Sequence, residues 1–559
     1  MKKVTRVNNI FILQLFKKRF YFSKEKLSYT ILFLSLIWLK EINYLFYDII
    51  ESPDFKKYFV YFEHFFSNNP TNHEHGLSYY YLQSLYLNTF FSNQPNLDFA
   101  LHKSVTDLNF YLFIIGLIGI YKLFKLFNFS NNSIALTLIF LNFFPPAISL
   151  RLVFKPEILA FSLFPWIIYL LEKFKITSQK IYLLMAIPLL VMTITLKGNI
   201  LTIICLYLLI SNYKIFSLLN FSTIMSLIFL LIILFTVVTI ENNRSNGKNI
   251  LDIQSGASLE SNYDFKAPKS IIYKTNLYEL FTSPVKHNHA DSFIAITLLE
   301  TSGDYFDLYW DNDATQFFKS RLEIFKFEQS NEIKLPEINH QNKTVTIFQQ
   351  RSTDVYLYET LGLILSIILF VTLIGTIVIS PSYRIYIIAV LIGMAVILVH
   401  AITGLPKNNF DPFVGDTFKP LYYSFTLLFS FSFAIVLCIE KKIFKFHHLL
   451  LYCFLIIFIL GFPKNDFSEI DSGFIQKIEH SIFCNIEKNI FLEDNSELVV
   501  DCNPNYENMK SNEFFNNNLK HKPFNLLLIL ASSGILLYII FEEKSYFLSR
   551  KTSIVENKH

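Results

Sequence analysis

The stretch NFSTIMSLIFLLIILFTVVTI, residues 220–240, contains no Asp, Glu, Lys or Arg. A helix needs about 20 consecutive apolar residues to cross the hydrocarbon core of a bilayer. Further apolar runs, several of them shorter than a full crossing, lie at 29–47, 108–127, 133–150, 156–171, 181–195, 199–212, 358–380, 384–402, 420–439, 448–462 and 524–542. The pattern predicts an all-α polytopic membrane protein with about twelve transmembrane helices.

The overall composition agrees with a membrane protein and argues against a nucleic-acid-binding protein. The 559 residues are 52% hydrophobic and only 17% charged, and the mean hydropathy is +0.38. The net charge is +4 and the cations are dispersed among short loops, which argues against a nucleic-acid partner. The abundance of Phe, Ile, Asn and Lys is typical of an A+T-rich, bacterial genome, so we expect a multi-pass protein of the bacterial inner membrane.

Basic residues in the short loops predict the orientation in that membrane, because cytoplasmic loops carry an excess of Lys and Arg. With alternation from the basic N-terminal arm, every loop predicted inside is basic, and both termini lie in the cytoplasm. The cations expected inside are Lys17, Lys18, Arg19, Lys24, Lys26, Lys122, Lys125, Lys173, Lys175, Lys180, Lys214, Arg384, Lys441, Lys442, Lys445, Lys544, Arg550 and Lys551.

The long polar loops then lie outside, and they divide the chain into three parts. Residues 1–240 form an N-terminal transmembrane module whose first outer loop is 48–107. Residues 241–357 form a small extracytoplasmic cap, α or α+β. Residues 358–559 form a C-terminal transmembrane module with an outer loop at 463–523. Cys484 and Cys502 both lie in that last loop, where a disulfide can persist, and we expect them to be bridged.

A charged stretch opens one of the apolar runs: Arg151-Leu-Val-Phe-Lys155-Pro156-Glu157. Pro156 at the first helical position and Glu157 in the first turn are typical of a helix start. In one interpretation the cations are interfacial and reach water along their stems. In the other, Arg151 and Lys155 join Lys197, at the same predicted level, in an anion site at a helix N-terminus.

The first outer loop carries three acids, Asp48, Glu51 and Asp54, three residues apart. One helical turn would gather them near one face, beside the apolar layer. Partial desolvation there raises the pKa of a carboxyl group and suits it to act as a general base. The alternative is a solvated amphipathic helix that lies on the bilayer.

The same loop contains His73-Glu74-His75-Gly76-Leu77, followed by Tyr79, Tyr80 and Tyr81. A lone His-x-His pair is a weak metal signal, and no further ligands stand at useful spacing. We therefore expect no metal site and no cofactor.

In their order, these pieces resemble the GT-C glycosyltransferases, the superfamily of protein O-mannosyltransferases and of aminoarabinose transferases. Such enzymes carry an acid in a long first outer loop, then a His-Pro-Pro-Leu-like stretch before Tyr or Trp, then Arg-Pro-Asp/Glu at a later outer helix start. Here His75-Gly76-Leu77 looks like the first stretch, with Gly for the prolines, and Lys155-Pro156-Glu157 like the second, with Lys for Arg. The similarity covers about the first 200 residues.

The resemblance implies a GT-C-like helix arrangement and a periplasmic active site on the N-terminal module. The donor would be a sugar on a polyprenyl phosphate, and the acceptor a hydroxyl of a glycan, lipid or protein. Arg151, Lys155 and Lys197 would bind the donor phosphate. Asp54, with Asp48 and Glu51 as reserves, would be the general base of one inverting displacement, without a metal. Glu74 and His75 would shape the acceptor side or orient the base, and Glu157 would be a further acceptor or site-shaping residue.

Three other function classes stay open, one of which is a structural or receptor-like membrane protein. A polytopic transporter commonly has twelve spans, but it is often built from repeated halves with polar residues at mid-helix, and neither feature is visible here. An O-antigen polymerase or ligase also uses lipid-linked substrates, but usually places its cations in large late loops. A groove that joins Asp54, Lys155 and Lys197 at the outer surface would favour the transferase.

Overall fold

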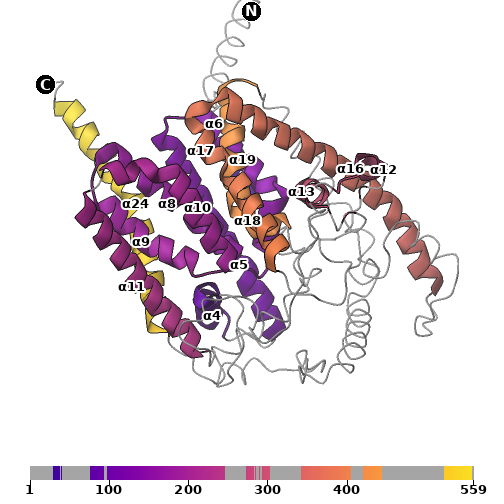
Figure 1. The fold of residues 1–559 in the computed structure, drawn as a ribbon, viewed down its shortest axis with the longest axis horizontal. Coiled ribbons are helices and arrows are strands. Elements are labelled where there is room, and N and C mark those ends of the chain that lie inside the picture. The colour runs from indigo at the N-terminus through magenta and orange to yellow at the C-terminus, as the bar shows by residue number, and fades with distance from the viewer. Residues whose placement is uncertain are drawn as a thin grey trace, which may run out of the picture.

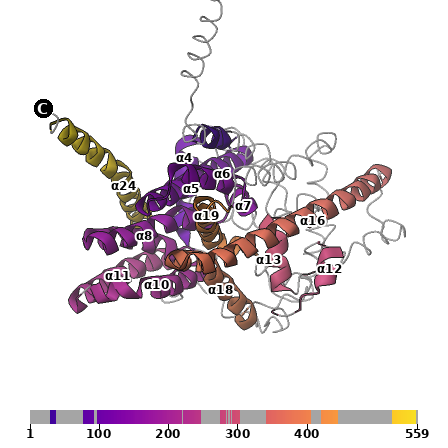
Figure 2. The same ribbon diagram turned by 90° about the horizontal axis from the view of Figure 1, so that it is seen from above.

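The computed structural model describes residues 29–37, 40, 76–92, 97–218, 220–245, 272, 274–282, 284, 289, 292–302, 341–404, 419–443 and 522–556. Within these residues every regular element is a helix and no strand occurs. The predicted all-α class is therefore confirmed for the described part of the chain. Figures 1 and 2 show the helices gathered in one bundle, from which the long helix α16 projects.

Six described helices are long and apolar enough to cross a membrane, or seven if one bent pair counts as a single span. The six stretches are Lys103–Leu126, Phe221–Glu241, Thr360–Ile379, Pro381–Ile402, Pro420–Glu440 and Pro523–Ile540. The run at 448–462 lies outside the described residues, and others form shorter or more charged helices. Several crossing helices support a membrane protein, and the number twelve stays a prediction.

The core of the bundle is the pairing of α5 (Leu97–Leu126) with α8 (Glu157–Thr177). The two helices run parallel, because Gly116 faces Phe161 and Gly119, one turn further along α5, faces Pro165, one turn further along α8. The Nε1–H of Trp166 also donates to the carbonyl of Ile115 at 3.0 Å. A Cβ on Gly116 would lie 2.5 Å from the Phe161 ring. A glycine is therefore needed for the helices to approach this closely.

The apolar run at 133–150, expected as one helix, is two helices. α6 (Asn131–Phe143) and α7 (Pro145–Leu152) meet at 60°. The reason is the Pro145-Pro146 pair, which cannot donate backbone hydrogen bonds to the preceding turn and instead begins a new helix. The break turns α7 toward the start of α8.

The short runs on either side of Lys197 form a helical hairpin of α9 (Ile181–Ile194) and α10 (Gly198–Leu218). Lys180, just before α9, donates to the hydroxyl of Thr223 in α11 (Phe221–Ser245) at 3.0 Å. Since α10 ends just before α11 begins, the start of α9 and the end of α10 lie together. The turn at Lys197 is therefore at the other end of the hairpin.

In the second half of the chain, α18 (Ala389–Gly404) packs antiparallel to α19 (Ser424–Glu440), which follows the short 3₁₀ turn η5 (Pro420–Tyr423). α19 is the most buried of the candidate spans. It contacts α8 through the ring of Phe164, which lies 4.9 Å from that of Phe429. The two modules expected from the sequence thus share one hydrophobic core.

The part of the expected cap that the structure describes is helical. α12 (Leu277–Thr282) and α13 (Phe293–Ser302) pack with α16 (Gln341–Ile379) in a small cluster of Leu280, Ala295, Leu299 and Leu363. Thr297 of α13 is also hydrogen-bonded to Tyr423, with 3.4 Å between the hydroxyl oxygens. α16 runs through the expected boundary at 357/358 without a break.

Basic helix ends gather at one end of the bundle. The backbone N–H of Ser130, between α5 and α6, donates to Glu440 at the end of α19 at 2.7 Å. Lys441 donates to the carbonyl of Ile379, at the end of α16, at 2.8 Å. The loops that carry Lys125, Arg384, Lys441 and Lys442 therefore belong to the same end of the bundle, and their side of a membrane stays a prediction.

Candidate functional site

The stretch Lys155-Pro156-Glu157 forms the turn from α7 to α8. The Nδ2 of Asn109 in α5 donates to the carbonyl of Val153 at 2.9 Å, which fixes the turn just after α7. Pro156 then caps α8, and Glu157 is its first residue. The sequence placed Pro156 one position later, inside the helix, and placed Glu157 correctly in the first turn. Lys155 and Glu157 are both buried.

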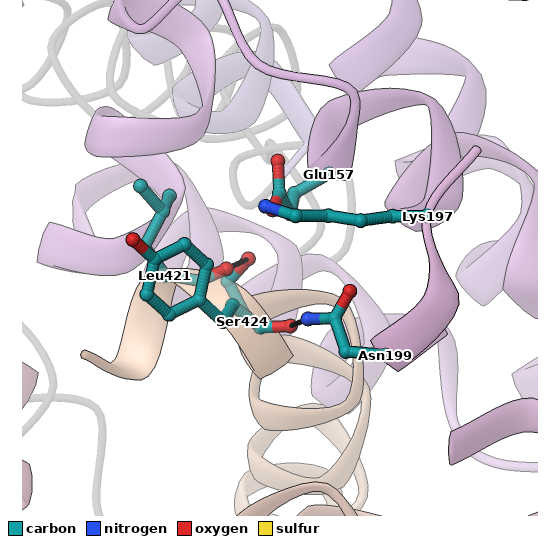
Figure 3. A network of polar contacts seen from close by, with 6 residues as sticks. Glu157, Lys197, Asn199, Leu421 and Ser424 are labelled. Carbon is teal, nitrogen blue, oxygen red and sulfur yellow. Dashed lines mark hydrogen bonds and ion pairs between the residues drawn. The ribbon is translucent and has the colours of Figure 1, made fainter. Parts of the chain in front are cut away.

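Lys197 is held opposite this turn, at the start of α10. Its carbonyl accepts the N–H of Leu201 at 3.0 Å, so it is the residue before the helix proper. Its ammonium lies 2.9 Å from Oε1 of Glu157, and Figure 3 shows the two side chains reaching toward one another. Residues 40 positions apart in the chain thus form an ion pair at the starts of two helices.

A single aromatic ring lies beside both lysines. The ammonium of Lys197 is 4.6 Å from the ring centre of Tyr422, and that of Lys155 is 5.5 Å from it. Both distances are within the range of a cation–π contact. Tyr422 is itself placed by its carbonyl, which accepts the Nδ2–H of Asn199 at 3.1 Å. Both ammonium groups therefore lie within 5.5 Å of the centre of one ring.

The two carboxylate oxygens of Glu157 differ: Oε1 is paired with Lys197, and Oε2 has no described hydrogen-bond partner. The Glu157 side chain is 0% exposed, and Oε2 has no hydrogen-bond partner among the described residues. A buried carboxylate oxygen without a donor carries a desolvation cost of about 1–3 kcal/mol or more. The site therefore favours any ligand group that can donate a hydrogen bond to Oε2.

Arg151, the third expected cation, makes different contacts. Its Nη2 donates to the carbonyl of Asn142 at 3.0 Å, and its guanidinium lies 4.6 Å from the ring centre of Phe113. Asn142 is near the end of α6, where a cation complements unsatisfied carbonyls. Arg151 is fully buried, so it does not reach water along its stem as one interpretation required. Its described contacts stabilise the α6–α7 bend.

Behind the turn lies a polar network that the sequence analysis missed. The hydroxyl of Tyr79 donates to Oδ1 of Asn109 at 2.8 Å, and Nε2 of Gln83 donates to both groups at 3.1 Å. Burial raises the pKa of Tyr79 far above its ordinary value, so the hydroxyl keeps its proton. The available signal was the i,i+4 spacing of Tyr79 and Gln83, with an Asn inside an apolar run.

Gly76, in the stretch His75-Gly76-Leu77, contacts the turn that carries Lys197. α4 (Leu77–Phe90) begins just after Gly76, whose N–H donates to the carbonyl of Leu196 at 2.8 Å. A Cβ at Gly76 would lie 1.7 Å from the carbonyl oxygen of Thr195. The stretch that ends Gly76-Leu77 and the turn that carries Lys197 are thus brought together.

α4 is also tied to the C-terminal helix α24 (Pro523–Glu556). Ser78 donates to Oδ1 of Asn525 at 2.7 Å. The carboxylate of Glu241, at the end of α11, accepts the N–H groups of Phe524 at 3.1 Å and Asn525 at 2.8 Å. An acid at a helix N-terminus satisfies orphan donors there. The sequence did not predict these contacts, because the residues that make them come from three distant segments.

Several expected site residues lie outside the described part of the chain. They are Asp48, Glu51, Asp54, Glu74, His75, Cys484 and Cys502. The structure therefore brings together Lys155, Glu157 and Lys197, and the proposed base stays a prediction. Within the described residues no group of three or more His, Cys, Asp or Glu could hold a metal ion.

Comparison of the chain with known protein families, curated proteins and solved structures found no match. Any functional conclusion therefore has to come from the chemistry of the site.

Proposed function

We propose that this protein is a membrane glycosyltransferase. It would move a sugar from a polyprenyl-phosphate donor to an acceptor hydroxyl on the periplasmic face of the bacterial inner membrane. The reaction would be a single inverting displacement without a metal.

One observation carries the proposal: Lys155 and Lys197 stand beside the same Tyr422 ring, at the starts of α8 and α10. Helix N-termini present backbone N–H groups and a partial positive charge, and nearby ammonium groups strengthen the attraction for a phosphate. The surrounding helices are apolar, which suits an anion carried on a lipid chain.

The proposed chemistry uses these charges at the leaving group. When the bond from the anomeric carbon to the phosphate oxygen breaks, negative charge grows on the lipid phosphate. Cations already in place stabilise that charge without reorganisation. Asp54 would take the proton of the acceptor hydroxyl as its oxygen attacks the opposite face of the sugar, which gives inversion. Glu74 and His75 would shape the acceptor side or orient the base.

Lysine substitutions test the anion site directly. We expect Lys155→Ala and Lys197→Ala to weaken binding of a polyprenyl-phosphate sugar, because each removes a charge-assisted contact of about 1.5–3 kcal/mol. Binding is measured on the full-length protein in lipid nanodiscs. Lys175→Ala is the matched control, since Lys175 pairs with Glu172, near the other end of α8. Unchanged donor affinity in both site variants would refute the proposal.

A transporter is the second candidate, because the 60° break between α6 and α7 resembles the discontinuous helices that line transporter sites. Reconstitution in liposomes separates the two functions. Transfer of labelled sugar from lipid to acceptor supports the enzyme, whereas gradient-dependent uptake of an anion without transfer supports the transporter.

A further inference from the structure

We propose that Glu157 makes this site selective for a singly charged phosphodiester head group over a doubly charged diphosphate. The inference rests on the proposed function, and it adds discrimination against diphosphate-linked lipids and the residue that causes it.

The first step is that charge at this site is poorly screened. The side chain of Glu157 is 0% exposed, that of Lys197 is 15% exposed, and Lys155 is 7% exposed. Electrostatic energies rise several-fold when charges leave bulk water for a protein interior. A mismatch of one charge between the site and its ligand is therefore costly here, although it would be minor on a wet surface.

The second step is a comparison of charges. Lys155 and Lys197 together supply two positive charges, and the Glu157 carboxylate, 2.9 Å from the ammonium of Lys197, removes one. The three groups leave a net single positive charge, which one phosphodiester charge neutralises. A diphosphate would leave a negative charge buried beside the Glu157 carboxylate. Whatever other groups line the site, the Glu157 carboxylate makes the net charge of the site one unit more negative.

The third step concerns the open oxygen of Glu157. Oε2 is buried without a described hydrogen-bond partner, and a carboxylate oxygen can only accept. A sugar hydroxyl donates to such an oxygen, whereas a second ionised phosphate group offers no donor and is repelled. The ligand that satisfies the whole site carries one negative charge and neighbouring hydroxyl groups.

Two probes that differ in charge test the inference. Farnesyl methyl phosphate carries one charge and farnesyl methyl diphosphate carries two, on the same chain and with the same cap. Their affinities are measured on full-length protein in lipid nanodiscs. We expect wild type to prefer the monophosphate at least tenfold. Glu157→Gln, which keeps the size of the side chain, should reduce that preference tenfold or more, equivalent to about 1.4 kcal/mol.

Two further variants control for structural effects. Glu157→Asp keeps the charge and should keep the preference. Glu172→Gln removes a carboxylate from the same helix, also paired with a lysine, and should leave the ratio unchanged. A merely structural ion pair would lower the melting temperature of Glu157→Gln without moving the ratio of the two affinities.

The outcomes distinguish this inference from the proposed function. If wild type binds both probes equally, or if folded Glu157→Gln keeps the wild-type ratio, the selectivity role of Glu157 is wrong and the phosphate site stands. If Glu157→Gln does not fold, loss of the preference in Glu157→Asp overturns the inference instead. If neither probe binds wild type, the proposed function fails, and this inference with it.

Discussion

Glu157 and Lys197 are charged groups in a largely apolar bundle, where taking two ions out of water costs several kcal/mol per ion. Their attraction only partly offsets that cost, and a well-packed apolar pair is often equally stable or more so. The open Oε2 adds to the cost. Packing alone therefore gives no reason for these residue types, whereas a ligand that binds the lysines and donates to Oε2 does.

The general base is the first prediction at this scale. Asp54→Asn keeps the size and hydrogen bonding of the side chain but removes the proton acceptor. We expect sugar transfer to fall roughly 10²–10⁴-fold while the amount of folded protein changes little. The measurement is transfer of labelled sugar from a polyprenyl phosphate in membranes that contain each variant.

Asp48→Asn and Glu51→Gln are the comparison variants. If one of these two substitutions abolishes transfer while Asp54→Asn does not, the general base is the acid replaced in that variant and not Asp54. Full activity in all three variants would remove the first-loop acids from the mechanism.

Gly76 gives a prediction on stability. In Gly76→Ala the new methyl group would collide with the backbone carbonyl of Thr195, which a side-chain rotation cannot relieve. Overpacking of this kind typically costs about 1–3 kcal/mol. The melting temperature in detergent should fall.

Gly375→Ala is the control for that measurement. Gly375 lies in α16 with nothing within 4 Å of its added Cβ. Since Ala is the better helix former by about 1 kcal/mol, this variant should melt at the same or a higher temperature. A Gly76→Ala protein as stable as wild type would show that α4 is not seated on the Lys197 turn.

The sequence was informative about single residues where local chemistry decides their position. The Pro156-Glu157 pair indicated the start of α8, and Lys197 was expected between the apolar runs 181–195 and 199–212, where the structure places the turn from α9 to α10. The ion pair between Glu157 and Lys197, and the shared ring of Tyr422, could not be predicted. Their partners are 40 to more than 200 positions apart, and local patterns carry no information on such contacts.

At the scale of elements, apolar runs predicted where helices lie better than where they break. The run at 133–150 was long enough for one helix, and its length hid the effect of Pro145 and Pro146. The same break gives Arg151 its described contact, because α7 turns back far enough for the guanidinium to reach the carbonyl of Asn142. An apparent interfacial cation is in this way part of a helix junction.

The loop at 463–523 carries a prediction that lies outside the described residues. Cys484 and Cys502 should form a disulfide, since both lie in a loop expected outside the cell membrane. A bridge that closes a loop of this length stabilises by about 3 kcal/mol in the chain-entropy model. Thiol labelling of protein isolated without reductant should leave both residues unlabelled. Labelling of both would exclude the bridge.

At the scale of the whole molecule, the two ends of the bundle differ in chemistry. The ends of α5, α16 and α19 bring Lys125, Arg384, Lys441 and Lys442 to one end. The opposite end of the bundle is where the parallel helices α8, α10 and α19 begin. Just before these starts stand Lys155, Lys197 and Tyr422, respectively. If the lysines form the proposed anion site, the basic loops at the opposite end of the bundle would place that site on the outer side of the membrane.

Topology is the prediction on which the proposed reaction depends. Because basic short loops stay in the cytoplasm, both termini should be cytoplasmic, and the loops 48–107 and 241–357 should lie outside. Fusions of alkaline phosphatase, which is active only in the periplasm, should be active after residues 92 and 272 and inactive after residues 128, 178 and 556. The inverse pattern would place Lys155 and Lys197 on the cytoplasmic side. A lipid-linked donor could not then be used at the outer face, and the proposed reaction would be wrong together with the orientation.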